Sequence, residues 1–590
     1  MLRLLLGRAG AGKSTAILRR IAASGGARRQ LLIVPEQASH ETERRLCAVA
    51  GNQVSLYAEV LSFTRLGSRV FSQAGGLAAP ALDPGGRLLL MCAALKSVSG
   101  SLTVYARPSR KPAFLTGLLA TLDECKQYQV FPDDLARAGE AVEGREGEKL
   151  RDLGLIFGAY EALSAQTAAD PRDRITRLAQ GLKECGYARG MDIYIDGFTD
   201  FTPQQGLVLR ALLRQAESVT VALTSDRLDR DTGASNIFAP ARRTAAYLRR
   251  MAGEEHVPAE AEYLPQRGEG RSAALARLEA NLFADVPAAA ASPAPEIGLF
   301  SALRPRSEVE YAASEVLRLV REEGCRFRDI ALVARGFERY APLVEEIFPR
   351  YGIPVFLDAM TDILQKPVFA VVTGALDVVA RGYSYDDVFR YLKTGLAGVS
   401  RGECDELENY VLKWGIKGNR WTAKADWDMH PRGYGFPMTG PDREWIARVN
   451  EARRKVVGPL EGLRKNRDRT GRGQAMALYR FLESIRLPEQ LAERSERLRA
   501  RGELKRAEEY GQLWEILCGG LEQCAGLLGE EPMELQEFAQ LFKLVLSQYD
   551  VGTIPVSLDR VNAGEAARLG NREVKALFFL GADDGAGTQV

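Results

Sequence analysis

The sequence predicts an α/β protein with two parallel-sheet cores, each interrupted by a helical insertion. Three observations predict this class. Strand and helix patterns alternate near the N-terminus, they alternate again from about residue 297, and each alternating region leads into a long segment with helical periodicity and no β-rich run. The chain has 590 residues, 46% of them hydrophobic, so it has enough apolar material for several packed cores.

The first core opens with a strand, a turn, a helix and a second strand. Leu2–Leu6 is a short apolar strand, Gly7–Gly12 a glycine-rich turn, Lys13–Ala23 a helix and Gln30–Val34 the next strand. This order predicts parallel pairing. Further strands are expected at Gln53–Tyr57, Met191–Ile195 and Ser218–Leu223. The first core should therefore comprise residues 1–80 and 190–250, around a helical insertion at 81–189.

A second core is expected after a linker. Residues 251–296 are Pro/Ala-rich and of low hydrophobicity, which predicts a linker with one short helix around Ala274–Phe283. Strands are then expected at Ile297–Ser301, Asp329–Ala334, Ile353–Phe356 and Ala576–Leu580. These assign residues 297–363 and 550–590 to a second, incomplete core around a helical insertion at 364–549.

Composition excludes several classes of protein. Lys and Arg number 79 against 77 Asp and Glu, a formal charge of +2, so any nucleic-acid site must be a local groove. No apolar run approaches the roughly 18 residues that span a bilayer, which predicts a cytoplasmic protein without a membrane segment. Eight scattered cysteines with no CxxC pair argue against a disulfide framework, a zinc site or an iron-sulfur cluster in this chain.

The glycine-rich turn fits the phosphate-binding pattern G-x-x-x-x-G-K-[ST]. It lies between a strand and a helix N-terminus, where backbone N–H groups and the helix dipole receive phosphate. Lys13 is expected to reach the β- and γ-phosphates, and Ser14 to ligate Mg²⁺. The expected nucleotide-binding residues are Gly7, Arg8, Ala9, Gly10, Ala11, Gly12, Lys13, Ser14 and Thr15. The expected cofactors are ATP and Mg²⁺.

Hydrolysis requires further groups. A carboxylate must hold the metal, and a neighbouring acid or amide must orient the attacking water. Asp196 follows the strand Met191–Ile195 and is the candidate second Mg²⁺ ligand, although it is also a plausible strand-end cap. The next residue is Gly197, so no acid stands beside it, and Asp200 is four residues away.

Several segments together resemble AddB, the second subunit of the bacterial AddAB helicase-nuclease. They run in order along the chain: the phosphate loop, VPEQ at residue 34, EVLSFTRL at 59, IYIDGFTDFTPQQ at 193, RDIALVAR at 328, ENYVLKWGIKG at 408 and IPVSLDRVNAG at 554. The resemblance covers essentially all 590 residues. It implies two RecA-like cores of the superfamily-one helicase type.

The resemblance also implies a helicase-like motor that lacks residues needed for ATP hydrolysis. Asp196-Gly197-Phe198-Thr199-Asp200 lines up with the helicase D-E-F-Q-D, so the catalytic Glu has become Gly197. The sensor Gln is absent after Ser218–Leu223. Arg335 matches a helicase arginine that approaches the γ-phosphate, with a solvated surface arginine as the alternative. Ser62, Phe63, Thr64 and Arg65 match a segment that contacts single-stranded DNA, with a core aromatic as the alternative for Phe63.

In that family the protein is about twice as long, and its second half carries a nuclease domain and an iron-sulfur cluster. The 590-residue chain is therefore expected to be truncated before both. The resemblance implies an AddA-type motor and nuclease subunit as partner, binding of mainly single-stranded DNA, and scanning for the Chi hotspot. Two alternatives remain open: an active DNA-dependent P-loop ATPase or helicase, and a structural subunit whose phosphate loop is vestigial.

Overall fold

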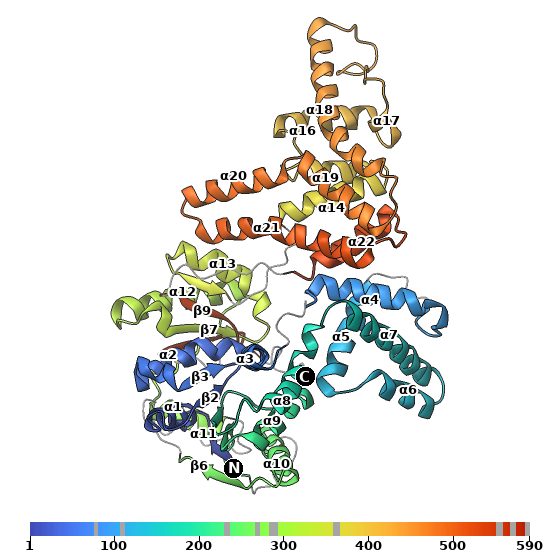
Figure 1. The fold of residues 1–590 in the computed structure, drawn as a ribbon. Helices are drawn as coiled ribbons and strands as arrows, with labels where there is room; N and C mark the ends of the chain where they lie inside the picture. Colours follow the sequence, from blue (N-terminus) through green and yellow to red (C-terminus); the bar gives the residue numbers. More distant parts are fainter. Residues whose placement is uncertain are drawn as a thin grey trace.

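The computed structural model describes residues 1–75, 81–106, 113–228, 236–265, 272–282, 293–357, 366–549, 559–566 and 574–583. It is α/β, with two all-parallel sheets and many helices, which confirms the predicted fold class. Figure 1 shows the two sheets in the lower part of the molecule, one helical insertion beside them and the other above.

The first core holds a six-stranded sheet, in the order β3-β2-β4-β5-β1-β6. All neighbouring strands are parallel, so their carboxyl ends meet at one edge. Strand β1 is buried along most of its length because helices cover both faces of the sheet. The strands are β1 (Leu2–Gly7), β2 (Gln30–Ile33), β3 (Ala58–Leu61), β4 (Asp192–Ile195), β5 (Ser218–Thr224) and β6 (Ala259–Tyr263).

Two helical layers sandwich this sheet. Leu5 of β1 packs with α1 and α2 on one face, while Leu4 and Leu6 pack with α3, α8, α9 and α10 on the other. This alternation follows from the two-residue period of a strand. The helices are α1 (Lys13–Ala23), α2 (Ser39–Ala50), α3 (Phe63–Ala74), α8 (Arg174–Cys185), α9 (Pro203–Gln215) and α10 (Ala239–Glu254), followed by α11 (Ala273–Asn281).

The second core is smaller. Its four parallel strands have the order β10-β7-β9-β8, and helices α12 and α13 pack into one apolar cluster with them. The elements are α12 (Pro305–Glu322), β7 (Ile330–Ala334), α13 (Ala341–Arg350), β8 (Val355–Leu357), β9 (Val561–Glu565) and β10 (Ala576–Leu580). Strands from both ends of the second half therefore complete one sheet around the helical insertion.

The two helical insertions share one continuous hydrophobic core. The first comprises α4 (Pro84–Val98), α5 (Ala113–Tyr128), α6 (Pro132–Ala141) and α7 (Arg145–Thr167). The second comprises α14 (Pro367–Ala380), α15 (Tyr385–Leu392), α16 (Arg401–Trp414), α17 (Asn419–Thr422), α18 (Gly440–Arg464), α19 (Gly471–Ser484), α20 (Leu487–Ala500), α21 (Leu504–Gln523) and α22 (Leu535–Leu546).

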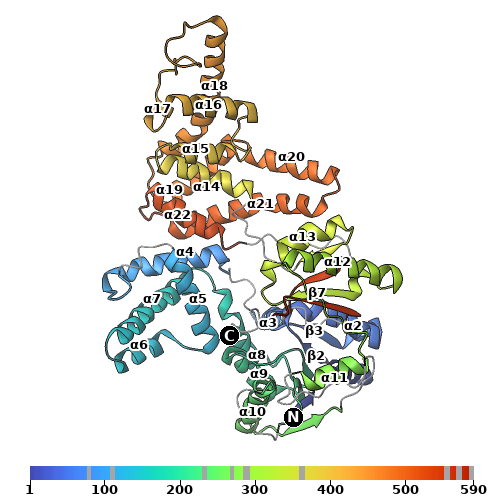
Figure 2. The same cartoon turned by 180° about the vertical axis from the view of Figure 1, so that it is seen from behind.

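Helix α4 is the point of contact between the insertions. It packs against α22, and both views of the molecule show the two helices side by side (Figures 1 and 2). The Tyr549 hydroxyl donates to Asp83 Oδ2 at 2.6 Å, and Lys96 Nζ lies 2.8 Å from Glu537 Oε1. These contacts tie the first core to the second through their insertions.

Four sequence-based expectations about single elements were wrong. A strand, β6, lies inside the segment expected to be a linker, and β9 was not expected at all. Residues 297–301 form no strand, and Leu299 among them is 98% exposed. Residues Asn52–Leu56 form a 3₁₀-helix, with the strand following at Ala58 instead. Helix α11 does lie where a short helix was predicted.

Candidate nucleotide site at the carboxyl edge of the first sheet

The phosphate-binding pattern lies where β1 ends and α1 begins. Gly10 and Gly12 have φ angles of +80° and +86°, in the left-handed region that favours glycine. A Cβ on Gly7 would approach the Ala11 Cβ to 2.8 Å, so a larger residue would force the turn open. Sequence and geometry agree here: each of these three glycines occupies a position that a side chain would disturb.

The loop presents groups suited to an anion. Ser14 and Thr15 lie in the first turn of α1, where backbone N–H groups find no acceptor within the helix itself. Lys13 Nζ donates to the carbonyls of Gly7 and Arg8, at 2.7 and 3.0 Å. The ammonium group is thus held over the loop, where a phosphate group would meet it.

Arg8 is fixed by a helix far away in sequence. Its guanidinium donates to Glu279 Oε1 at 3.0 Å and to the Glu279 carbonyl at 2.9 Å, and it lies 5.2 Å from the Phe238 ring. Glu279 belongs to α11, so this helix is clamped beside the phosphate loop. Sequence reasoning missed Glu279 and Phe238, because no local pattern signals contacts across separations of 271 and 230 residues.

Asp196 follows β4 at the same edge of the sheet. Strand β5 lies between β4 and β1, which separates the β4 and β1 backbones by about 10 Å. The Asp196 N–H donates to the Ile33 carbonyl at 3.0 Å, and its Oδ1 accepts from the Gly197 N–H at 2.9 Å. A carboxylate oxygen accepts more than one bond, so this group suits a Mg²⁺ ion held together with Ser14.

The water-orienting position beside Asp196 is occupied by Gly197. Its φ of +81° is again in the left-handed region, so the chain turns sharply here. Thr199, the residue at the helicase Gln position, uses its carbonyl to accept from the Thr244 hydroxyl at 2.9 Å. The turn therefore places no carboxylate directly after the metal-binding candidate.

The polar residues directly after β5 make hydrogen bonds and an ion pair within the protein. Ser225 is fully buried and its N–H donates to the Gly7 carbonyl at 3.3 Å. Asp226 accepts from Arg242 Nη2 at 2.8 Å. Burial alone would raise the pKa of Asp226, but the Arg242 bond holds that pKa below its ordinary value. This carboxylate is thus committed to a structural ion pair.

The segment proposed to contact DNA lies at the start of α3. Ser62 is the N-cap of the helix, and its hydroxyl accepts from the Arg65 N–H at 3.2 Å. Phe63 is only 5% exposed and lies edge-on to Phe198, with ring centroids 5.5 Å apart. Thr64 and Arg65 are exposed. The structure thus divides the four residues into a buried pair and an exposed pair.

Arg335 lies in the second core, directly after β7, and its side chain is exposed. The neighbouring N–H groups of Gly336 and Phe337 donate to the carboxylate of Glu565, at 3.2 and 3.1 Å. This edge of the second sheet is therefore already supplied with an anion from the chain itself.

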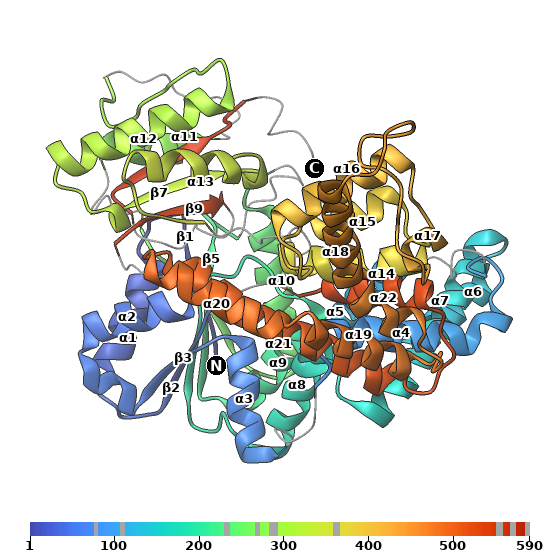
Figure 3. The same cartoon turned by 90° about the horizontal axis from the view of Figure 1, so that it is seen from above.

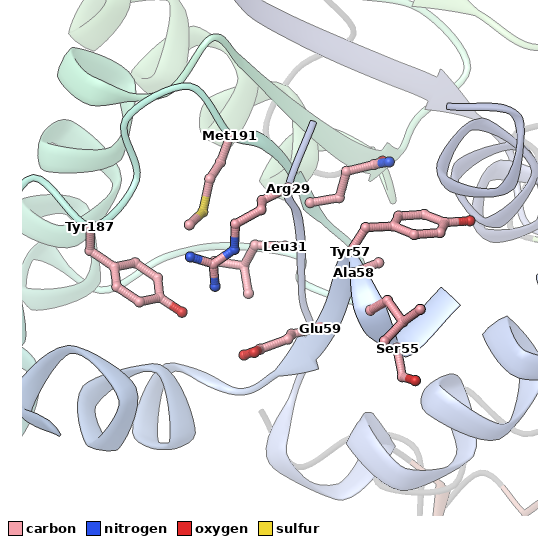
Figure 4. Close-up of a pocket in the computed structure, with 10 residues that line it drawn as sticks. Arg29, Leu31, Ser55, Tyr57, Ala58, Glu59, Tyr187 and Met191 are labelled. Carbon is pink, nitrogen blue, oxygen red and sulfur yellow. The ribbon is translucent and has the colours of Figure 1, made fainter. Parts of the chain in front are cut away.

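A small cavity lies at the amino edge of the first sheet. It has a volume of about 30 Å³, the space of one water molecule. Figure 4 shows the Arg29 side chain extending towards Tyr187 and Glu59. Burial, and secondarily the Glu59 carboxylate, raise the pKa of Tyr187. A cavity of this size holds no nucleotide, so the carboxyl edge remains the candidate site.

The described ranges contain neither a preformed metal cluster nor a membrane-spanning helix. No group of three or more His, Cys, Asp or Glu side chains is arranged to hold a metal ion among the residues that the structure describes. In the same part of the chain, no helix is long and apolar enough to cross a bilayer.

The fold defines the class, an α/β protein with two parallel-sheet cores, and a loop of the phosphate-binding pattern joins β1 to α1. Residues 4–279 match the family model described as ADDB, N-terminal. The B subunit of the ATP-dependent helicase/deoxyribonuclease of Acetivibrio thermocellus is 34% identical, over 99% of this chain and 52% of the relative. The corresponding proteins of Clostridium tetani and a Thermoanaerobacter species, which carry the same name, are 32% and 33% identical over the same shares. The chain is thus similar to these B subunits over almost its whole length, and it spans about half the length of these relatives.

Proposed function

We propose that this chain is the helicase-like, non-translocating part of an AddB-type protein, which binds ATP with Mg²⁺ and single-stranded DNA. One observation carries the proposal: a glycine-rich loop that leads into the first turn of α1, with the Lys13 ammonium group held over it, stands beside an Asp196 that is followed by Gly197. The loop suits nucleotide binding, whereas the turn after β4 lacks the group that orients an attacking water.

The residues present fit ATP and Mg²⁺. The N–H groups at the start of α1 and Lys13 Nζ would hold the phosphates, and Ser14 with Asp196 would hold the metal. Mg²⁺ bound there neutralises phosphate charge. Arg335 is proposed as a further phosphate contact from the second core.

Thr64 and Arg65 are the proposed contacts to single-stranded DNA. Both are exposed at the start of α3, and the buried Phe63 and Ser62 fix the backbone beneath them. A cation on a rigid helix start suits the phosphate groups of a strand.

The family supports the remaining part of the proposal. The relatives are named as B subunits, so we propose an AddA-type motor and nuclease subunit as partner and a role in double-strand-break processing. Scanning of the single strand for Chi is proposed on the resemblance alone. Nuclease activity and the iron-sulfur cluster are assigned to the part of the relatives that this chain does not match.

Nucleotide binding is tested by titrating the chain with a fluorescent, non-hydrolysable ATP analogue and Mg²⁺. We expect saturable binding, and a loss of about 10- to 100-fold in affinity for Lys13→Ala, since charge-assisted hydrogen bonds of this kind contribute about 1.5–3 kcal/mol. Lys183→Ala removes an exposed lysine of the same core and is the control. Equal affinity in wild type and Lys13→Ala would refute binding at the loop.

DNA binding is tested with a labelled oligothymidine single strand over a salt series. Removing one phosphate contact should lower the salt slope by about 0.7. We expect this change for Arg65→Ala. Arg69→Ala is the matched control, because Arg69 lies on the same helix but faces Glu59 at 3.3 Å. Identical slopes for both variants and the wild type would remove Arg65 from the proposed DNA site.

A further inference from the structure

Helices α20 and α21 form an antiparallel hairpin that projects from the second helical insertion over the side of the molecule holding the two sheets (Figures 1 and 3). The hairpin is internally fixed. The Ser495 hydroxyl donates to the Ala507 carbonyl at 2.8 Å, and the Arg494 guanidinium lies 5.3 Å from the Tyr510 ring. Gly502, with a φ of +78°, makes the turn at the tip. The tip is therefore a rigid frame for the side chains it carries.

A cavity of about 350 Å³ opens near this tip. It is lined by Arg494, Arg497, Leu498, Arg501, Glu503 and Arg506. Arg494 and Arg497 of α20 and its C-cap residue Arg501 are spaced by three and four residues, which places them on one side of this helix end. Arg506 comes from α21, and Leu498 is buried. Four guanidinium groups thus surround one hollow, whose size is within the range of ligand sites.

The chain itself compensates this charge poorly. Arg497 lies 3.5 Å from Glu493 and Arg506 lies 2.6 Å from Glu503, but both arginines are more than half exposed, so these pairs are weak. The Arg501 N–H donates to the Leu498 carbonyl at 3.1 Å, while its side chain is exposed. Residues 493–506 contain six Lys or Arg against three Glu, a net charge of +3 in a chain whose total is +2.

We propose that this arginine cavity binds the phosphate backbone of a DNA strand. Arginine is suited to phosphate because its planar guanidinium donates two parallel hydrogen bonds. Arg499, just past the cavity, is paired with Glu496, but the net charge of +3 over residues 493–506 favours an extended polyanion over a single small anion. The proposal rests on the DNA binding proposed above and adds a second site, in the helical insertion, to the segment at α3.

The test compares Arg497→Ala/Arg501→Ala with Arg469→Ala/Arg472→Ala. The control pair removes the same charge from the same insertion outside the cavity, where Arg469 and Arg472 form comparably exposed ion pairs with Glu534 and Glu530. All four arginines are exposed, and Arg494 on Tyr510 stays intact, so both variants should fold. Binding of a labelled oligothymidine strand is measured over a salt series, together with the fluorescent ATP analogue.

We expect the cavity variant to lose about tenfold in DNA affinity and to lower the salt slope by about 1.4, for two phosphate contacts. Nucleotide affinity should be unchanged, and the control variant should bind DNA like the wild type. Equal DNA affinity and slope in all three proteins would overturn the cavity proposal while leaving the proposed function intact.

Two further outcomes also contradict the cavity site. If inorganic phosphate displaces the strand at matched ionic strength, the cavity is a small-anion site. If DNA binding is unchanged but binding of poly-glutamate is lost in the cavity variant, the site belongs to an acidic protein. A wild type that binds no DNA even at about 50 mM salt would refute the DNA part of the proposed function as well.

Discussion

The carboxyl edges of the two parallel sheets differ in the charged groups that lie there: a lysine in the first core and carboxylates in the second. In the first core, the loop after β1 leads into the first turn of α1, and the Lys13 ammonium group is held over it by two backbone carbonyls. In the second core, the N–H groups of Gly336 and Phe337 already donate to Glu565. Glu308 likewise accepts from the Gly581 N–H at 2.7 Å and the Tyr340 hydroxyl at 2.9 Å.

This difference explains why only one core is proposed to hold a nucleotide. A parallel sheet collects strand ends and backbone donors at one edge, and an anion is favoured there. The second core fills those positions with its own carboxylates, so its edge is a structural element. In the first core the phosphate-binding pattern lies at this edge instead, and we propose that a ligand supplies the anion there.

The largest expected effect comes from Glu565→Ala. It leaves two N–H groups of the second core without their acceptor, so we expect the free energy of unfolding to fall by about 1.5–3 kcal/mol. Denaturant unfolding measures this loss. Nucleotide affinity should stay at the wild-type value; a parallel loss of nucleotide binding would show that the two edges are coupled.

Tyr340 should make the stability of the second core depend on pH in the alkaline range. Burial and the bond to Glu308 raise the pKa of Tyr340 to about 12. An unfolded tyrosine ionises near pH 10, so between about pH 10 and 12 the folded state keeps a proton that the unfolded state has lost. Stability should therefore be complete below this window and fall as the pH rises through it. Tyr340→Phe should remove that part of the pH dependence in denaturant unfolding, and identical profiles would contradict it.

Asp196→Asn tests the metal side of the first edge. We expect the factor by which Mg²⁺ increases nucleotide affinity to be about tenfold smaller in this variant, because the neutral amide attracts the ion less than the carboxylate does. Asp200→Asn is the matched control, because Asp200 is exposed on the same turn. If the two variants respond equally to Mg²⁺, Asp196 is only a strand-end cap.

The smallest expected effect concerns the contact between Arg8 of the phosphate loop and Glu279 of α11. Glu279→Ala releases Arg8 from a half-buried ion pair worth about 1 kcal/mol or less, so nucleotide affinity should rise by up to about fivefold. In an Arg8→Ala background the same change should have no effect. Weaker binding in Glu279→Ala would show that α11 supports the loop instead.

The sequence predicted the first edge well because its signals are local. The strand before Gly7, the glycines and the helix from Lys13 lie within one short segment, and the helix has the predicted bounds. Phe63 shows the limit of this reasoning. A motif matched it to a segment that contacts single-stranded DNA, with a core aromatic as the alternative, and only the structure shows that its ring is buried against Phe198.

The missed strands depended on partners far away in the chain. The β6 sequence AEAEY resembles a linker, yet Arg3 and Arg20 pair with its Glu260 and Glu262 at the sheet edge. The β9 sequence VNAGE is polar and is buried by neighbours more than 200 residues away. The apolar run at 297–301 is not a strand, because no neighbouring strand pairs with it in the described part of the chain. Glu279 was likewise beyond prediction from local patterns.

The central claim is that the first edge binds ATP without turning it over, and steady-state ATP hydrolysis by the purified chain tests it most directly. Hydrolysis is measured with and without single-stranded DNA, beside the nucleotide titration on the same sample. We predict saturable binding that needs Lys13 and no DNA-stimulated turnover. A DNA-stimulated rate of about 1 s⁻¹ or more, within the ordinary range of enzymes, that is lost in Lys13→Ala would contradict the claim.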